Sequence, residues 1–527
     1  MTERRCGRRE LAWAFLAFVV LAAATALLYR PVLGFELMGD DYQWWQHAHL
    51  AMHRPVELLT DLDTFYRPAS TWTLVLDRLA FGDVPAAFHA TNLALHVLAG
   101  LLLVVAGRRL GLARPEASAV GLLWTLSPFT DEPAISVAIR FQDLLLISWL
   151  ALVLAWPARG GRWTRGRLAA AVAATLLAAA SKESWVVTPA LAVALEAARG
   201  ERRTVRWIRA AVPFAAAAAL YTAVYFMAFP GGKGYFSSDP AVLAKVPHEL
   251  AAFLNLEPFT PVAFPLTWQG LFAVAFVVGL AVGAWRRRLG AGVVGSAFLL
   301  FPALPTLFVP YLPTRYTAIP YAGFLMLVAA WAAFLRTDGA ASATVRRAAP
   351  AAAAVLAGLV LVAGCLTVRA DLVDFGRVST AHRRLLEEAA AFLPAVPADR
   401  PALVVRLERE NPLAAIARDP KGLPKLFYVR HADPYGLIDA AALFEWVAGR
   451  EDLAWERVGP REVQGHPGDV ILHGNGGFRC AEPAGDLAAA AERWRANGFP
   501  YRVIRPVALA PEARGRRQDP RRVPERG

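Results

Sequence analysis

Long apolar runs alternate with short polar stretches along most of the chain. A run of about 20 apolar residues crosses a bilayer as a helix, because lipid offers backbone groups no hydrogen-bond partners. The predicted spans are residues 11–29, 86–106, 116–130, 140–156, 168–181, 184–198, 210–229, 269–285, 291–308, 317–335 and 348–368. The pattern therefore predicts an α-helical polytopic membrane protein with about eleven transmembrane helices.

The composition favours the same class. Of the 527 residues, 56% are hydrophobic and 19% are charged, whereas soluble domains carry about a quarter charged residues. The formal net charge of +13 raises the question of nucleic-acid binding. The arginines lie between apolar runs instead of along one helix face, so we expect no nucleic-acid partner.

The arginines also predict the orientation. They gather in alternate loops at 108–114, 159–167, 199–209, 286–288 and 336–347, whereas the opposite loops carry more acids. Because cytoplasmic loops are rich in Lys and Arg, this predicts a plasma (inner) membrane protein with a cytoplasmic N-terminus. We interpret 11–29 as an uncleaved first helix, because its length exceeds that of a signal-peptide core.

The chain divides into three predicted regions. Residues 1–368 form a transmembrane domain whose long external loops cover 30–85 and 230–268. An odd number of spans places residues 369–527 on the external side of the membrane. Of these, 369–514 has the pattern of a small α/β domain. Its predicted strands lie at 402–407 and 470–472, and its predicted helices at 436–449 and 483–496. Residues 515–527 are rich in Arg and Pro and are expected to be disordered.

Two adjacent carboxylates follow the first predicted span. Asp40 and Asp41 lie in the sequence GDDYQWW. Near a membrane surface, one carboxylate can act as a general base while the other orients it or holds the acceptor. The alternative is a solvated turn after Gly39.

A polar face runs along the second predicted span. His89, Asn92 and His96 are three and four residues apart, so they share one side of a helix. They could line a substrate pocket inside the bundle. The alternative is a set of hydrogen bonds between helices, which polar side chains also provide in membranes.

Two further groups of charged residues fall at the external ends of predicted helices, where ionisable side chains are functional candidates. Asp131, Glu132, Arg140 and Asp143 flank a short external segment, where they could pair with one another or contact a substrate. Lys182-Glu183 and Arg315-Tyr316 supply cations suited to a lipid-linked phosphate. Snorkelling of these cations to lipid headgroups is the alternative.

Several classes of site are not indicated. No Walker loop, dinucleotide fingerprint or GxSxG elbow occurs in a suitable context. The three cysteines form no CxxC pair, and no spacing suits metal ligands, so no cofactor is expected and no metal is indicated, although metal dependence stays open. We therefore expect any activated donor to arrive as a lipid-linked substrate in the membrane plane.

Four stretches together resemble a known family. They are Asp40-Asp41, then Tyr66-Arg67-Pro68 followed by His89-x-x-Asn92-x-x-x-His96, then Ser181-Lys182-Glu183, and then Arg315-Tyr316 followed by Ile319-Pro320-Tyr321-x-Gly323-Phe324. This set is similar to the motifs of the GT-C superfamily of membrane glycosyltransferases. It most resembles the dolichyl- or polyprenyl-phosphate-mannose-dependent O-mannosyltransferases with TPR repeats, and their bacterial relatives.

The resemblance implies a GT-C-like fold and a hexosyl- or mannosyl-type glycosyltransferase. A polyprenyl-phosphate sugar in the outer leaflet would transfer its sugar to a hydroxyl of an acceptor protein or glycan. Asp40 would be the base with Asp41 beside it, and Lys182 and Arg315, with Arg140, would hold the phosphate. The remaining pocket residues would be Tyr66, Arg67, His89, Asn92, His96, Glu132, Glu183 and Tyr316.

The chain also departs from the family. Ser127-Pro128 stands where the family has His-Pro, and neither a TPR array nor a β-trefoil follows the membrane region. The sequence therefore does not identify the transferred sugar or the acceptor. The alternatives are a polysaccharide polymerase or ligase using a diphosphate-linked donor, a transporter or flippase of a lipid-linked substrate, and a scaffold with an external binding domain.

Overall fold

The structure is a computed structural model of the full chain. It describes residues 2–38, 40–53, 67–158, 161–200, 204–228, 244–256, 266–302, 304, 314–337, 343–392, 402–406, 446, 453–458, 469–474, 477–480 and 501–506. Within these ranges the chain forms two compact units. Unit 1 comprises the described residues within 1–37 and 47–377, and unit 2 comprises those within 38–46, 378–419 and 429–527.

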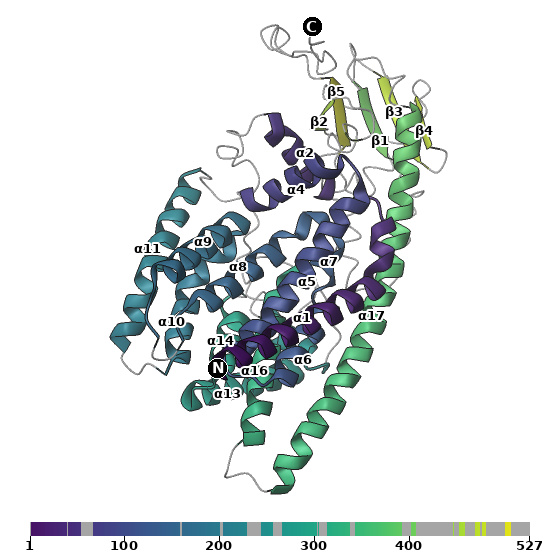
Figure 1. Ribbon diagram of the computed structural model, residues 1–527. Helices are drawn as coiled ribbons and strands as arrows, with labels where there is room; N and C mark the ends of the chain where they lie inside the picture. Colours follow the sequence, from purple (N-terminus) through teal and green to yellow (C-terminus); the bar gives the residue numbers. More distant parts are fainter. Residues whose placement is uncertain are drawn as a thin grey trace. The chain divides into compact units, whose positions relative to one another are not determined.

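Each of the eleven predicted spans overlaps a helix (Figure 1). Seven helical segments of the described residues are long and apolar enough to cross a membrane. They lie in α1 (Thr2–Tyr29), α5 (Pro85–Arg109), α8 (Phe141–Ala155) with the 3-10 turn before it, α11 (Thr204–Ala228), α13 (Trp268–Arg287), α16 (Thr314–Thr337) and α17 (Ala343–Phe392). The other four predictions overlap shorter helices, namely α6 (Arg114–Thr125), α9 (Arg165–Ser181), α10 (Thr188–Ala198) and α14 (Gly290–Leu300).

Short helices occupy the segments between the spans. They are η1 (Arg30–Gly34), α2 (Asp40–His53), α4 (Pro68–Phe81), α7 (Asp131–Ile135), η2 (Val137–Ile139), η3 (Glu183–Val187) and α12 (Lys245–Phe253). Proline begins several helices, as at Pro68 in α4 and Pro85 in α5. It suits a first turn, because its fixed φ is helical and its missing N–H would have no partner there.

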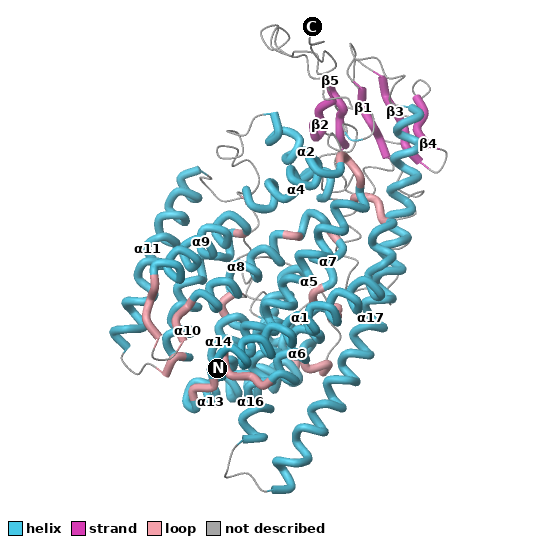
Figure 2. The backbone as a smooth tube through the Cα atoms, in the orientation of Figure 1, coloured by secondary structure: helices cyan, strands magenta, loops and turns pink. Residues whose placement is uncertain are grey.

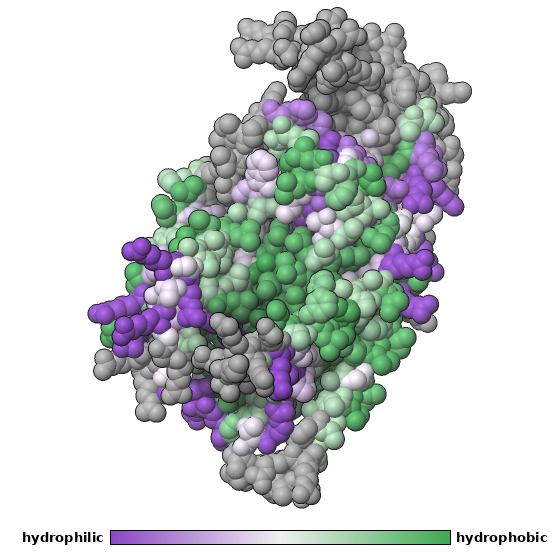
Figure 3. Space-filling view, viewed as in Figure 1, coloured by the Kyte–Doolittle hydropathy of each residue, from purple (hydrophilic) through white to green (hydrophobic). Residues whose placement is uncertain are grey.

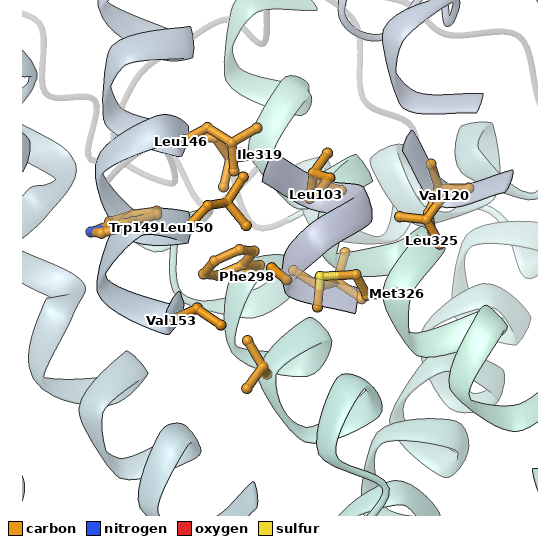
Figure 4. Packing of buried hydrophobic residues seen from close by; sticks show 14 of the residues in the cluster. Leu103, Val120, Leu146, Trp149, Leu150, Val153, Phe298, Ile319, Leu325 and Met326 are labelled. Carbon is orange, nitrogen blue, oxygen red and sulfur yellow. The ribbon is translucent and has the colours of Figure 1, made fainter. Parts of the chain in front are cut away.

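The apolar core of unit 1 lies where α5, α6, α8, α14 and α16 meet (Figure 4). Trp149 of α8 stacks on Phe298 of α14, with ring centroids 5.8 Å apart. Two glycines bring α14 and α16 together: a Cβ atom on Gly295 would lie 2.7 Å from the carbonyl oxygen of Gly323. Small residues of this kind let helix backbones approach closely inside membranes.

Unit 1 also presents apolar side chains outward. Figure 3 shows a broad hydrophobic face over its helices. Exposed large residues occur on α1, α9, α11, α13 and α17, including Leu27, Leu176, Leu220, Phe272 and Leu359. Apolar surface of this extent is rare on soluble monomers and matches contact with lipid.

Unit 2 contains a five-stranded mixed sheet (Figure 2). Its strands are β1 (Ala402–Arg406), β2 (Leu453–Val458), β3 (Asp469–Gly474), β4 (Gly477–Cys480) and β5 (Tyr501–Pro506), in the order β2-β5-β1-β3-β4. β1 and β3 pair in parallel and the other pairs are antiparallel. The predicted strands at 402–407 and 470–472 fall on β1 and β3.

The units do not follow the predicted regions in every detail. α17 continues to Phe392, beyond the predicted end of the last span at 368, and the division between units falls inside it after Arg377. Met38–Gln46, from the first loop, belongs with unit 2. The predicted helix at 483–496 and the tail at 515–527 lie outside the described residues, and so does 436–449 except for Trp446.

Candidate functional site

Lys182 and Arg315 meet over one aromatic ring in unit 1. The ammonium of Lys182 lies 4.5 Å from the centroid of Tyr316, and the guanidinium of Arg315 lies 5.6 Å from the same centroid. The centroid of the Phe141 ring also lies 5.2 Å from the ammonium of Lys182. Both cations are buried. Aromatic faces attract cations within about 6 Å, so the rings help to hold the two charges together.

Arg67 completes this group of cations. Its guanidinium lies 3.9 Å above the Phe141 ring and forms a bidentate pair with Glu183, at 3.1 and 3.0 Å. We call Arg67, Lys182, Arg315, Phe141 and Tyr316 the cation cluster. Arg67, Lys182, Arg315 and Tyr316 come from three separate motifs of the family resemblance. Phe141 belongs to none of these motifs.

Local structure explains how each cation is presented. Pro68 begins α4, which leaves Arg67 as the residue just before the helix. Lys182 follows the end of α9 in an extended conformation and precedes η3. Arg315 lies in the first turn of α16. All three cations therefore project from helix ends, where the direction of the chain changes.

Glu132 fixes the position of Arg315. One carboxylate oxygen accepts from the backbone N–H of Arg315 at 2.7 Å, and the other accepts from its guanidinium at 3.1 Å. The first N–H groups of a helix lack partners within the helix, and they favour a negative charge. Glu132 therefore caps α16 and pairs with Arg315 at the same time.

Lys182 differs from the two arginines in its partners. Arg67 pairs with Glu183 and Arg315 pairs with Glu132, whereas no carboxylate of the described residues forms an ion pair with Lys182. Burial lowers the pKa of Lys182 well below its usual value, and the nearby charge of Arg67 lowers it further. An added anion would restore the charge of this ammonium, so the cluster can accept an anionic group.

Arg140 lies in a different network. Its guanidinium is fully buried and donates to Asn92 at 2.9 Å, to Thr73 at 3.1 Å, to Asp77 at 2.8 Å and to the carbonyl of Phe88 at 3.1 Å. These contacts join α4 and α5 to the beginning of α8. Asp77 is a carboxylate partner of Arg140, and Asp143 lies beside His96.

The polar face of α5 makes contacts between helices. Asn92 donates to the carbonyls of Pro133 and Ser136, at 3.3 and 2.6 Å. His96 lies 3.0 Å from a carboxylate oxygen of Asp143 and 3.1 Å from the carbonyl of Thr125. His89 is buried with its ring edge-on to Phe35, 6.5 Å away. These contacts match the hydrogen-bonding alternative for Asn92 and His96.

Asp40 and Asp41 belong to unit 2 and begin α2. Asp41 is fully buried, and its carboxylate accepts from the backbone N–H of Met38 at 3.0 Å. Asp40 is half-buried. Lys182 and Arg315 belong to unit 1, so the expectation that the two acids meet them stays a prediction.

Sequence reasoning missed several buried residues of unit 1. Phe141 gave no signal, because aromatic residues are common in apolar runs. Asp77 did give one, since an acid within the apolar stretch of α4 is costly without a partner. In α12, Lys245 and Glu249 are also buried. Tyr66, which was predicted to line the pocket, lies outside the described residues. Among the described residues, no group of three or more His, Cys, Asp or Glu side chains could hold a metal ion.

The helices and their apolar surfaces define the class: the chain is an α-helical polytopic membrane protein. No family model matches it, and no curated protein matches it. A crystal structure of ArnT from Cupriavidus metallidurans bound to undecaprenyl phosphate is similar at a TM-score of 0.48 and 15% sequence identity, covering 95% of this chain and 99% of that one. A TM-score below 0.5 does not establish a common fold.

Proposed function

We propose that the protein is a GT-C-type glycosyltransferase that moves a sugar from a polyprenyl-phosphate carrier to an acceptor hydroxyl at the external face of the membrane. The observation that carries this proposal is the cation cluster, in which a buried Lys182 has aromatic neighbours but no carboxylate partner among the residues that the structure describes. A phosphate headgroup supplies the anion that this ammonium lacks. Exposed apolar side chains on the helices of unit 1 suit the attached lipid chain.

The charge of the cluster favours a single phosphate over a diphosphate. Arg67 and Arg315 each have a carboxylate partner. Once a bound anion restores the charge of Lys182, the three cations and the two carboxylates Glu132 and Glu183 together leave one net positive charge. A sugar phosphodiester brings one negative charge. A diphosphate-linked donor brings two, and the second would lack a counter-charge within this group. This contrast argues for the transferase over a polymerase or ligase that uses a diphosphate.

The chemistry follows from the leaving group. The acceptor oxygen forms a bond to the anomeric carbon, the bond from that carbon to the phosphate oxygen breaks, and the hydroxyl proton passes to a carboxylate. The departing phosphate monoester gains negative charge. Fixed cations in a poorly hydrated setting stabilise that charge as it develops. We assign this role to Lys182 and Arg315, and transfer by direct displacement inverts the anomeric configuration.

Asp40 is our choice for the base. It is half-buried, so an acceptor can reach it, whereas the side chain of Asp41 is fully buried. We assign Asp41 the task of fixing the turn that carries Asp40. Arg140, Asn92 and His96 act as positioning residues, because their contacts hold α4, α5 and α8 together.

The test replaces both acids by Asn and measures sugar transfer from a polyprenyl-phosphate donor in membranes. Loss of a general base costs about a hundredfold or more in rate, so the double variant is expected to lose at least that much. Asp83→Asn is the matched control, because Asp83 lies on the surface and pairs with Arg78. Full activity in the Asp40→Asn, Asp41→Asn variant would refute the assigned base.

A competition experiment separates the transferase from the alternatives. Polyprenyl monophosphate is expected to inhibit transfer more strongly than polyprenyl diphosphate of the same chain length. Stronger inhibition by the diphosphate would favour the polymerase or ligase. Movement of a lipid-linked sugar across sealed vesicles, without transfer to an acceptor, would favour the transporter.

A further inference from the structure

Unit 2 contains an aromatic cluster that the proposed reaction does not use. Tyr42 and Trp45 of α2 both contact Trp446, with ring centroids 6.1 and 5.0 Å apart and the rings edge-on. Tyr42 also stacks on His382 of α17, with an interplanar angle of 13°. Three segments far apart in the sequence therefore meet at the first turns of α2.

These first turns are the ones that carry the acidic pair. Asp41 precedes Tyr42 directly, and Trp45 lies one helical turn after Asp41. The carboxylate of Asp41 ties the helix to the preceding backbone through its hydrogen bond from Met38. The rings of Tyr42 and Trp45 are buried, which leaves little freedom for this turn to rotate.

α2 needs outside contacts to hold its shape. It has 14 residues, and isolated helices of about 12–15 residues are marginal in water. Trp446 supplies such contacts from the C-terminal domain, where it lies in a predicted helix of residues 436–449. Edge-on aromatic pairs have a preferred geometry, so they constrain orientation as well as burying surface.

We propose that Trp446 of the C-terminal domain is a positioning residue for the Asp40-Asp41 pair. Its ring holds Tyr42 and Trp45, and through them it sets the direction in which the carboxylate of Asp40 projects. This assignment rests on the proposed function and gives the C-terminal domain a part in it. Under this proposal the C-terminal domain positions the catalytic acids in α2, in addition to any binding of a partner.

The proposal predicts a particular kinetic pattern. A misplaced base slows the chemical step, and a displacement of about 1 Å can cost a hundredfold. Trp446→Ala is therefore expected to lower kcat ten- to hundredfold while the KM for the lipid donor changes less than threefold. The donor phosphate is assigned to other residues, in the cation cluster of unit 1. Trp446→Phe, which keeps a flat ring, is expected to restore most of the rate.

The experiment compares Trp446→Ala, Trp446→Phe and the control Trp268→Ala in the purified full chain. Trp268 is 84% exposed, so its loss should change neither kcat nor the unfolding temperature. The same preparations are titrated with donor in the absence of acceptor, which confirms that the folded variants still bind lipid. Wild-type kcat in Trp446→Ala, or a loss of rate that Phe does not rescue, would overturn the proposal.

A second measurement does not depend on activity. A double-mutant cycle of Tyr42→Ala and Trp446→Ala on the unfolding temperature measures whether the two rings are coupled. We expect the double variant to lose clearly less than the sum of the two single losses. Additive losses would overturn the assignment even if transfer is confirmed. Coupling without any transfer by the wild type would instead mean that the proposed function is wrong.

Discussion

At the scale of single residues, two kinds of buried cation have different surroundings. The guanidinium of Arg140 donates to four different residues within the protein. Lys182 has aromatic faces near its ammonium but no ion pair among the described residues. Both looked alike in the sequence, as cations at the ends of apolar runs. Their partners lie far away along the chain, so the difference could not be predicted.

Asp77 and Arg140 provide a test of this distinction. Removing one partner of a buried ion pair leaves an uncompensated charge, which costs about 3–5 kcal/mol. Asp77→Asn and Arg140→Gln should therefore each lower the free energy of unfolding by about that amount, measured by denaturation in detergent. The double variant should lose less than the sum of the two.

The folded fraction of Arg140→Gln should bind donor like the wild type, because Arg140 is assigned a structural task. Arg336→Gln is the comparison for stability, since Arg336 pairs with Glu116 in a more exposed setting and should cost about 1 kcal/mol or less. Normal stability of Arg140→Gln together with weakened donor binding would instead mean that Arg140 binds the donor phosphate.

Glu249 in α12 predicts a dependence of stability on pH. Burial raises the pKa of Glu249 to about 8. The unfolded chain releases this proton near the ordinary value of 4.5, so between 4.5 and 8 the folded state binds more protons. The free energy of unfolding should therefore fall as the pH rises through this window, and Glu249→Gln should remove that part of the decline.

Lys245 produces the opposite slope at higher pH. Burial lowers the pKa of Lys245 to about 8, from 10.5. Between these values the unfolded chain binds more protons, so stability should rise with pH. Together the pair predicts a minimum near pH 8 in unfolding experiments. The same pH profile for wild type and Glu249→Gln would contradict this account of α12.

At the scale of elements, hydropathy predicted where the helices lie better than where they end. The predicted span at 291–308 corresponds to α14, which ends at Leu300. Pro302 and Pro305 follow, and proline cannot continue a helix without losing a hydrogen bond. The short helices α7 and α12 were not predicted, because their mixed polarity gives no clear period over so few residues. Proline at a first helical position was the available signal for α4.

The contact between α14 and α16 is the clearest prediction at this scale. A Cβ on Gly323 would lie 2.8 Å from the carbonyl carbon of Phe298 and nearer still to the backbone of Gly295 and Leu299. Gly323→Ala should therefore push the helices apart and lower the free energy of unfolding by about 1–3 kcal/mol. The control is Gly279→Ala in α13, where nothing lies within 4 Å and stability should be unchanged or higher. Equal stability of the two variants would contradict this packing.

At the scale of the whole molecule, the motifs were predictable as a set but their geometry was not. Lys182 and Arg315 were expected to lie together because they resembled two motifs of one family. Folding does bring them to the same ring of Tyr316. The contribution of Phe141 and the contact of Trp446 with α2 depend on tertiary packing, which no local pattern encodes. The orientation of the chain in the membrane stays a prediction from its arginines.

The most direct test of the phosphate site is equilibrium binding of a polyprenyl monophosphate to the purified full chain in lipid nanodiscs. A hydrogen bond to a charged group contributes about 1.5–3 kcal/mol, so Lys182→Gln should raise Kd at least about tenfold. Arg336→Gln, at the other end of the helix that carries Arg315, should leave Kd unchanged. Equal Kd values for wild type and Lys182→Gln would contradict the account.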